Sequence, residues 1–424
     1  MDRRSNRTDK NYGAIYADRA IDKAVYDGLY AVFADGAYCA KAITDALKTL
    51  KSDRPRAFVT SAFYGVLDNN VRLEKIISDL CEKAPDVQSS TVLKIGMYYI
   101  MYADMPDYAA VNRTVELSKQ IGGVFGGFIN AVLKKSIGYT PKFKSGIARF
   151  SYEHNAPEWL CRMLIDDYSE TRAAALLDAK LPDKTHIRPI KGRMTEKEFD
   201  DICVKNNCER TEYGCYVDKA AQDEFPRDGV TAQSLSSVYA VQAYVKDIKR
   251  GKALDLCAAP GGKSIYLAEL GFDVTACDIY AHKIELIKNR AKKLGVKLSA
   301  VVNDATKRNE SFVGAYDLVV ADCPCSGTGT LKSKPDIMLK RKPSDLADLC
   351  ALQYKILDAS AQYCKAGGVL CYSTCSVLKC ENEGIKAKFL QNHPEYALVD
   401  EVKLLPDKDK CDGFYIVRFK RKQI

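Results

Sequence analysis

The C-terminal part of this chain, residues 230–424, alternates short apolar segments with longer amphipathic ones. The short segments are typical of buried strands, and they fall at 253–257, 273–277, 298–302, 316–321, 369–372 and 414–419. Between them, apolar residues recur at helical spacing over 264–270, 281–294, 346–364 and 384–391. This alternation predicts an α/β domain in which helices cover both faces of a parallel sheet.

The rest of the chain predicts two further parts. Residues 1–140 show helical spacing without strand alternation, over 18–35, 57–67, 73–80, 91–102, 112–120 and 126–135. Residues 141–229 read as a small connecting subdomain, with helices at 159–168, 171–177 and 195–205 and a mixed, proline-containing stretch at 178–191. We therefore expect domains at 1–140, 141–229 and 230–424.

The chain has 16 cysteines, and its first ten residues are charged and polar. No run of 18 apolar residues occurs, so we expect no membrane segment and a cytoplasmic protein with reduced thiols. Cys203, Cys208 and Cys215 lie close together, but they form no CxxC pair, and the four histidines are scattered. This spacing predicts no metal. A formal charge of +9 permits a polyanionic partner without establishing one.

Two cysteine loops follow predicted strands. Asp322-Cys323-Pro324-Cys325-Ser326-Gly327 follows the strand at 316–321, and Ser373-Thr374-Cys375-Ser376 follows the strand at 369–372. Because carboxyl ends of parallel strands meet at one edge of a sheet, we expect Cys325 and Cys375 to face each other there. A cysteine in a chain this rich in cysteine is, by itself, more often a small core residue.

A glycine-containing loop joins the first strand of this domain to its helix, where doubly wound folds bind ligands. The loop is neither GxGxxG nor a Walker loop, because the first glycine of the latter is absent although Lys263-Ser264 is present. Asp278, Asp304 and Asp322 end the next three strands. One such carboxylate can accept hydrogen bonds from ribose hydroxyls, and another can accept a hydrogen bond from an adenine amino group. This set suits S-adenosylmethionine, which has no phosphates.

These motifs resemble a known family. Residues 254–263 (Leu-Asp-Leu-Cys-Ala-Ala-Pro-Gly-Gly-Lys), the loop 322–327 and Thr374-Cys375-Ser376-Val377 are similar to RNA 5-methylcytosine methyltransferases of the NOL1/NOP2/Sun family. Residues 110–117 and 127–134 resemble the RNA-binding helical domain named for NusB, although a purely structural helical bundle stays open. Together they resemble the bacterial Sun type, which methylates small-subunit (16S) ribosomal RNA. One departure is Cys323, where the family usually has alanine.

The resemblance implies a Rossmann-like seven-stranded methyltransferase domain after a NusB-like domain, with S-adenosylmethionine as methyl donor and ribosomal RNA as partner. It assigns cofactor binding to Cys257, Ala258, Ala259, Pro260, Gly261, Gly262, Lys263, Asp278, Asp304 and Asp322. It makes Cys375 the nucleophile at cytosine C6, gives Cys325 a part in product release and lets Asp322 contact the base. DNA enzymes use the thiol at the position of Cys325 instead, and that alternative stays open.

Basic residues follow the Asp322 loop and predict contact with RNA phosphates or, alternatively, an ordinary solvated loop: Lys332, Lys334, Lys340, Arg341 and Lys342. The catalytic motifs do not separate ribosomal RNA from transfer RNA, and a non-catalytic ribosome-assembly factor is a further alternative. We expect a monomer.

Overall fold

The structure, a computed structural model, describes residues 19–423, so the polar first ten residues lie outside it. The chain divides into two compact units, one through Arg162 and one from Met163 onward. We describe each unit by itself. The predicted boundaries at residues 140 and 229 stay predictions.

The first unit is helical, as predicted. Its helices are α2 (Arg19–Phe33), α3 (Cys39–Leu47), α4 (Asp53–Asp68), α5 (Asn70–Leu80), α6 (Val87–Met101), α7 (Asp107–Ile121), α8 (Gly126–Ser136) and α9 (Gly146–Glu153); α10 (Glu158–Asp167) contains the boundary. A buried polar group joins three of them, because Asp22 of α2 accepts hydrogen bonds from Tyr99 of α6 at 2.8 Å and from Arg113 of α7 at 2.7 Å. The sequence did not reveal α3 and α9.

The second unit begins with a small sheet that the sequence did not reveal. Its strands are β1 (Thr185–Pro189), β2 (Glu209–Thr211), β3 (Gly214–Val217) and β4 (Val230–Ala232), in the order β2-β3-β1-β4. Helices α11 (Glu170–Asp178), α12 (Glu196–Lys205) and α13 (Lys219–Asp223) accompany it. Strands of three to five residues are too short for alternation to be recognised.

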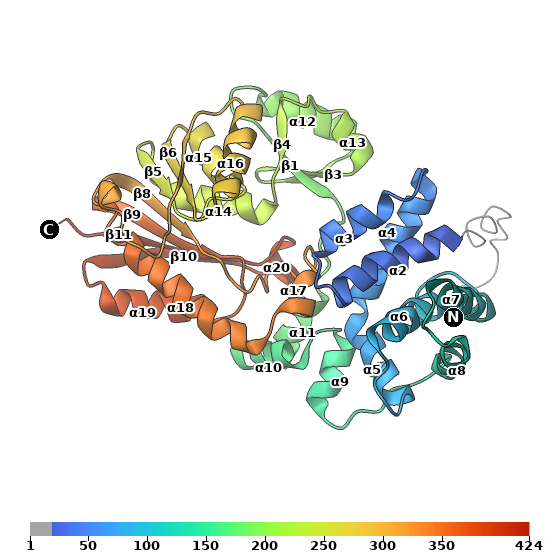
Figure 1. Cartoon of the computed structure of the whole chain (residues 1–424). Helices are drawn as coiled ribbons and strands as arrows, with labels where there is room; N and C mark the ends of the chain where they lie inside the picture. Colours follow the sequence, from blue (N-terminus) through green and yellow to red (C-terminus); the bar gives the residue numbers. More distant parts are fainter. Residues whose placement is uncertain (1–18, 424) are drawn as a thin grey trace. The chain divides into compact units, whose positions relative to one another are not determined.

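The remainder forms the predicted seven-stranded sheet (Figure 1). Its strands are β5 (Lys252–Asp255), β6 (Asp273–Asp278), β7 (Ser299–Val302), β8 (Tyr316–Asp322), β9 (Cys364–Thr374), β10 (Tyr396–Leu404) and β11 (Phe414–Arg421). The order is β10-β11-β9-β8-β5-β6-β7, in which β11 pairs antiparallel with β9 and β10 and the other pairs are parallel. The expectation of a parallel sheet thus holds except at this edge. β10 was missed because Asp400, Glu401 and Lys403 interrupt its apolar residues, most of which are exposed.

Helices cover both faces of this sheet, as predicted. The helices in this part of the chain are α14 (Leu235–Val245), α15 (Gly262–Glu269), α16 (Ala281–Lys293), α17 (Asp336–Lys340), α18 (Pro343–Ser360), α19 (Glu383–Asn392) and α20 (Pro406–Asp409). Alternate residues of β8 enter different cores: Leu318 and Val320 pack with α14 and α15, whereas Val319 and Ala321 pack with α18 and α19. Among the described residues, no helix is long and apolar enough to cross a membrane.

Candidate active site

The two predicted cysteine loops meet at the carboxyl ends of neighbouring strands. β8 and β9 pair in parallel, with Asp322 opposite Ser373 in the register. The loops that follow bring the Sγ atoms of Cys325 and Cys375 to 3.1 Å. Cys325 is buried and Cys375 is partly exposed, so Cys375 is the thiol that a ligand reaches more readily.

The two thiols differ in acidity. The hydrogen bond with Cys325 is the main reason that the pKa of Cys375 is lowered, against the effects of burial and the charge of Asp322; Lys334 and Lys263 lower it further. The same hydrogen bond, then burial, raises the pKa of Cys325 well above its usual range, and Glu381 adds to this rise. The arrangement therefore favours a Cys375 thiolate that accepts a hydrogen bond from the Cys325 thiol.

A buried carboxylate holds the Cys325 loop. Glu381 is fully buried, and its Oε1 accepts from the Ser326 backbone N–H at 2.8 Å and from Gln353 Nε2 at 2.9 Å. Its Oε2 accepts from the Ser326 hydroxyl. All three partners are able to donate, so the two oxygens of Glu381 can accept from all of them. Glu381 thus ties the loop after β8 to the segment that follows β9.

Close backbone contacts hold the Cys375 loop. The side-chain amide of Asn382 donates to the Ser376 carbonyl at 2.9 Å, and the Gly329 N–H donates to the Cys375 carbonyl at 2.9 Å. A Cβ atom on Gly329 would lie 2.2 Å from the Gly413 carbonyl oxygen, so no larger residue fits there without movement. The backbone is therefore held at the carbonyl of Cys375 and at that of the next residue.

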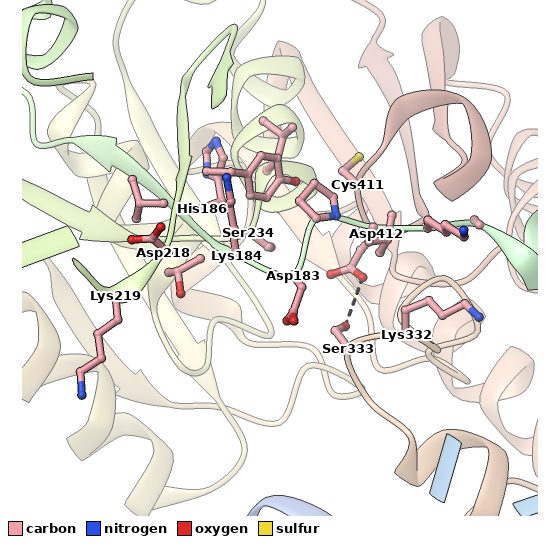
Figure 2. Close-up of a pocket in the computed structure, with 18 of the residues that line it drawn as sticks. Asp183, Lys184, His186, Asp218, Lys219, Ser234, Lys332, Ser333, Cys411 and Asp412 are labelled. Carbon is pink, nitrogen blue, oxygen red and sulfur yellow. Dashed lines mark hydrogen bonds between the residues drawn. The ribbon is translucent and has the colours of Figure 1, made fainter. Parts of the chain in front are cut away.

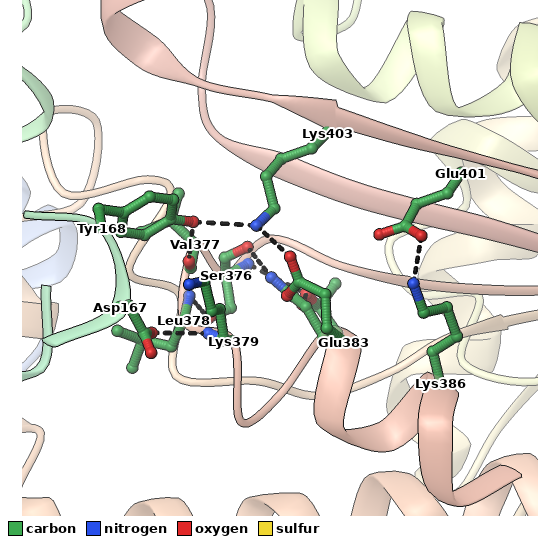
Figure 3. A network of polar contacts seen from close by, with 12 residues as sticks. Asp167, Tyr168, Ser376, Val377, Leu378, Lys379, Glu383, Lys386, Glu401 and Lys403 are labelled. Carbon is green, nitrogen blue, oxygen red and sulfur yellow. Dashed lines mark hydrogen bonds and ion pairs between the residues drawn. The ribbon is translucent and has the colours of Figure 1, made fainter. Parts of the chain in front are cut away.

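Further polar contacts hold the segment after Cys375 (Figure 3). The Tyr168 hydroxyl donates to the Val377 carbonyl at 2.5 Å, and the Lys379 N–H donates to Asp167 Oδ2 at 2.8 Å. Lys403 Nζ in turn donates to the Tyr168 hydroxyl at 3.1 Å. Residues at the start of this unit thereby position the loop of the reactive thiol.

A cavity of about 890 Å³ opens beside the two thiols. The predicted residues that line it are Cys257, Ala259, Pro260, Lys263, Asp278, Asp304, Asp322, Cys325 and Cys375, with Lys334. Ala258 and Gly262 line an adjoining smaller cavity, and Gly261 precedes α15 with a φ of 98°, a conformation that favours glycine. The glycine loop, the three acids and the two thiols thus surround one space.

The acids of this cavity are anchored differently. Asp322 is held on both oxygens, by Lys263 Nζ at 2.7 Å and by the Ser373 hydroxyl at 2.9 Å. Asp304 accepts from the hydroxyl and the N–H of Thr306, and these hydrogen bonds lower its pKa. Asp278 accepts from the Tyr280 N–H at 3.1 Å. Asp278 and Asp304 are acceptors for hydroxyl and amino groups, so the set fits a nucleoside such as the one in S-adenosylmethionine.

The basic residues 332–342 do not all face solvent. Lys332, Lys334 and Lys342 are exposed. Arg341 instead donates to the backbone carbonyls of Ser326 and Cys325, at 3.3 and 3.2 Å. Arg341 therefore supports the Cys325 loop.

A second cavity, of about 1090 Å³, adjoins the first, and the two share Ser234, Ser333 and Asp412 (Figure 2). It lies between the small sheet and the loops of the larger one. Its lining carries both charge signs, with Lys180, Lys184, Lys219, Lys332, Asp178, Asp183, Asp218 and Asp412.

Sequence reasoning missed several residues of the site. Glu381 and Gln353 brace the Cys325 loop, Asn303 and Phe414 line the first cavity, and the Tyr244 hydroxyl bonds the hydroxyl of Ser373 at 2.5 Å. Tyr244 and Gln353 lie in helices far from the motifs along the chain, and no local pattern marks them.

Two family models match the chain. Residues 244–420 match the family described as 16S rRNA methyltransferase RsmB/F, and residues 22–137 match the NusB family. The "Probable ribosomal RNA small subunit methyltransferase B" of Bacillus subtilis is 30% identical over 412 residues, which cover 88% of this chain and 92% of that protein. The "Ribosomal RNA small subunit methyltransferase B" of Vibrio vulnificus is 28% identical, with 93% and 98% covered.

Solved structures show the same fold. PH0851 superposes with a TM-score of 0.79 at 21% identity, over 95% of this chain and 99% of that one. NSun6 from Pyrococcus horikoshii, solved with SFG, has a TM-score of 0.54 at 16% identity, over 62% of this chain and 98% of that one.

Proposed function

Because the chain belongs to the 16S rRNA methyltransferase RsmB/F family, we propose that it methylates carbon 5 of a cytosine in 16S ribosomal RNA. The observation that carries this proposal is the pair of thiols, 3.1 Å apart, at the wall of the cavity that holds the acids. In a family that methylates ribosomal RNA, a thiol nucleophile favours a pyrimidine as the target. Carbon 5 of a pyrimidine becomes reactive toward a methyl donor only after a nucleophile has added to the ring.

S-adenosylmethionine, when bound, supplies an electrophilic methyl group, and Asp278 and Asp304 would hold its ribose and adenine. Cys375 adds to cytosine C6 as a thiolate, so that C5 becomes nucleophilic. Asp322, held by Lys263 and Ser373, would contact the base and stabilise the charge that develops on it. After transfer, C5 loses its proton to solvent, the C5–C6 double bond re-forms, and Cys375 leaves C6 as a thiolate; Cys325 assists this release.

The lowered pKa of Cys375 supports this assignment, since the nucleophile has to be a thiolate. The raised pKa of Cys325 supports its role as a proton carrier rather than as the nucleophile of the DNA enzymes. The cytosine has to leave its stack to reach Cys375, so the target is an unpaired or flipped base.

The exposed side chains of Lys332 and Lys334 support the binding of an RNA substrate. Lys332 lines the second cavity and Lys334 lines the first, so both could contact RNA phosphates on either side of the target base. A cytoplasmic monomer that acts on ribosomal RNA is the simplest form of this proposal.

The test uses adduct trapping with a 16S rRNA fragment and S-adenosylmethionine. Cys325→Ala should accumulate a protein–RNA adduct that resists denaturation, Cys375→Ala should form none, and Cys380→Ala should behave as the unaltered protein. An adduct in Cys375→Ala but none in Cys325→Ala would reverse the roles. Mapping 5-methylcytosine in cellular RNA with and without the gene separates ribosomal from transfer RNA, and a lack of any change would favour a non-catalytic factor.

A further inference from the structure

The small sheet holds a cluster of three thiols outside the active site. The Sγ atoms of Cys203, Cys208 and Cys215 all lie within 4.8 Å of one another. None of the three lines the cavity beside Cys375. The proposed methyl transfer uses none of them.

The local backbone brings these thiols together. Cys203 lies near the end of α12, and the chain turns back so that the Cys208 N–H donates to the Cys203 carbonyl at 2.9 Å. Asn207, with a φ of 49°, makes this turn. The hairpin of β2 and β3 then places Cys215 opposite Arg210 in the register. One short segment, residues 203–215, therefore supplies all three side chains.

A positively charged side chain, that of Arg210, lies near the three thiols. Arg210 donates to the Gly214 carbonyl at 2.8 Å and pairs with Asp200 at 2.5 Å. Burial raises the pKa of Cys203 and Cys215, and the nearby guanidinium of Arg210 acts in the opposite direction on both.

Access to the cluster is one-sided. Cys203 and Cys215 are 1% and 0% exposed and pack among apolar residues that include Phe199 and Phe225. Cys208 is only partly buried, so it connects the cluster to solvent. An ion would enter, and a water would complete its coordination, on the side of Cys208.

We propose that Cys203, Cys208 and Cys215 bind one thiophilic divalent cation of the Zn²⁺ class. In a tetrahedral site with Zn–S bonds of about 2.3 Å, neighbouring sulfur atoms lie about 3.8 Å apart. The thiols need to approach by at most about 1 Å to reach that geometry. Each thiol releases its proton to solvent as its sulfur–metal bond forms. Sulfur ligands select against Mg²⁺ and Ca²⁺.

The bound ion would fasten the end of α12 to the β2–β3 hairpin. Three thiolates and a divalent ion carry one net negative charge, beside the ion pair of Arg210 with Asp200. Among the described residues, no further Cys, His, Asp or Glu joins the group, so the fourth position belongs to water. The inference is independent of the proposed methyl transfer.

The test is a Co²⁺ titration of the full-length, reduced, metal-free protein, followed by sulfur-to-cobalt charge-transfer absorption. We expect one equivalent to bind and Zn²⁺ to displace it. Cys208→Ser removes the solvent-side ligand and should weaken Co²⁺ binding about tenfold or more, whereas Cys380→Ser, which removes an exposed thiol elsewhere, should leave it unchanged. Equal binding by both variants would overturn the proposal.

A second measurement needs no substitution. Alkylation of the unaltered protein, mapped by mass spectrometry, should show that stoichiometric Zn²⁺ protects Cys208, the partly exposed thiol of the cluster. Protection confined to Cys325 and Cys375, or to no peptide, would overturn the proposal even where Cys208→Ser fails to fold.

Discussion

Replacing Glu381 tests whether a buried carboxylate holds the Cys325 loop in place. Glu381→Ala removes the acceptor for two N–H groups, those of Ser326 and Gln353. Glu381→Gln keeps an oxygen that can accept from both, but it removes the negative charge. Glu383 provides the control, since it begins α19 two residues later and makes a partly exposed ion pair with Lys403.

The magnitudes follow from the partners that each change leaves behind. Glu381→Ala leaves two buried donors unsatisfied, at about 1–3 kcal/mol each, so we expect a loss of about 4 kcal/mol in the free energy of unfolding. Glu381→Gln replaces charge-assisted hydrogen bonds by neutral ones and changes the bond to the Ser326 hydroxyl. We expect it to lower the free energy of unfolding by about 1–2 kcal/mol. Glu383→Ala breaks only a pair with side-chain exposures of 31% and 21%, and we expect less than about 1 kcal/mol.

The assay is urea unfolding, followed by hydrogen exchange in the peptides that cover residues 322–330. The order of loss should be Glu381→Ala, then Glu381→Gln, then Glu383→Ala, with early exchange in this loop for Glu381→Ala. If Glu381→Ala and Glu383→Ala have the same unfolding free energy, the carboxylate does not hold the loop and our account of Glu381 is wrong.

Two further predictions concern titrating groups. Because the pKa of Cys375 is lowered, iodoacetamide should modify Cys375 before Cys325, and at a lower pH than it modifies an ordinary thiol. Lys334→Met removes a nearby positive charge and should shift the modification of Cys375 to higher pH. Equal rates at both thiols would contradict this. Burial raises the pKa of Asp255 to about 6, so the folded state holds this proton more tightly than the unfolded state does. The contribution of Asp255 to the free energy of unfolding is therefore complete below about pH 4, and it falls by about 3 kcal/mol as the pH rises to about 6. Asp255→Asn should remove this pH dependence. Urea midpoints between pH 4 and 7.5 check this, and parallel curves for the two proteins would refute it.

The sequence predicted the elements whose signal is local. The strands that end at Asp278 and Asp322 were recognised because buried parallel strands are continuous apolar runs bounded by turn residues. β10 and the small sheet lacked that signal, since charged residues interrupt the largely exposed β10 and the strands of the small sheet have three to five residues. Short strands depend on pairing partners far along the chain, which periodicity does not report.

In the candidate site, too, only the residues that a local motif marks were predictable. Motifs placed Cys325 and Cys375 at the ends of two strands, and parallel pairing was enough to predict that they face each other. Glu381 was not predictable, because the hydrogen bond to Ser326 spans 55 residues of sequence. The thiols of Cys203 and Cys215 were judged by the spacing of known zinc motifs, whereas the hairpin brings them together in another spacing.

The surroundings of the two catalytic-loop thiols give a physical reason for a division of labour between them. Both are cysteines of short loops at neighbouring strand ends, so residue type alone does not distinguish them. Lys334 and Lys263 lower the pKa of Cys375, whereas Glu381 raises that of Cys325. With one proton shared across 3.1 Å, these charges favour leaving the proton on Cys325 and the negative charge on Cys375. The same side chain that we expect to hold the Cys325 loop therefore also biases which thiol carries the negative charge, and Glu381→Gln should narrow the difference in alkylation rate between the two thiols.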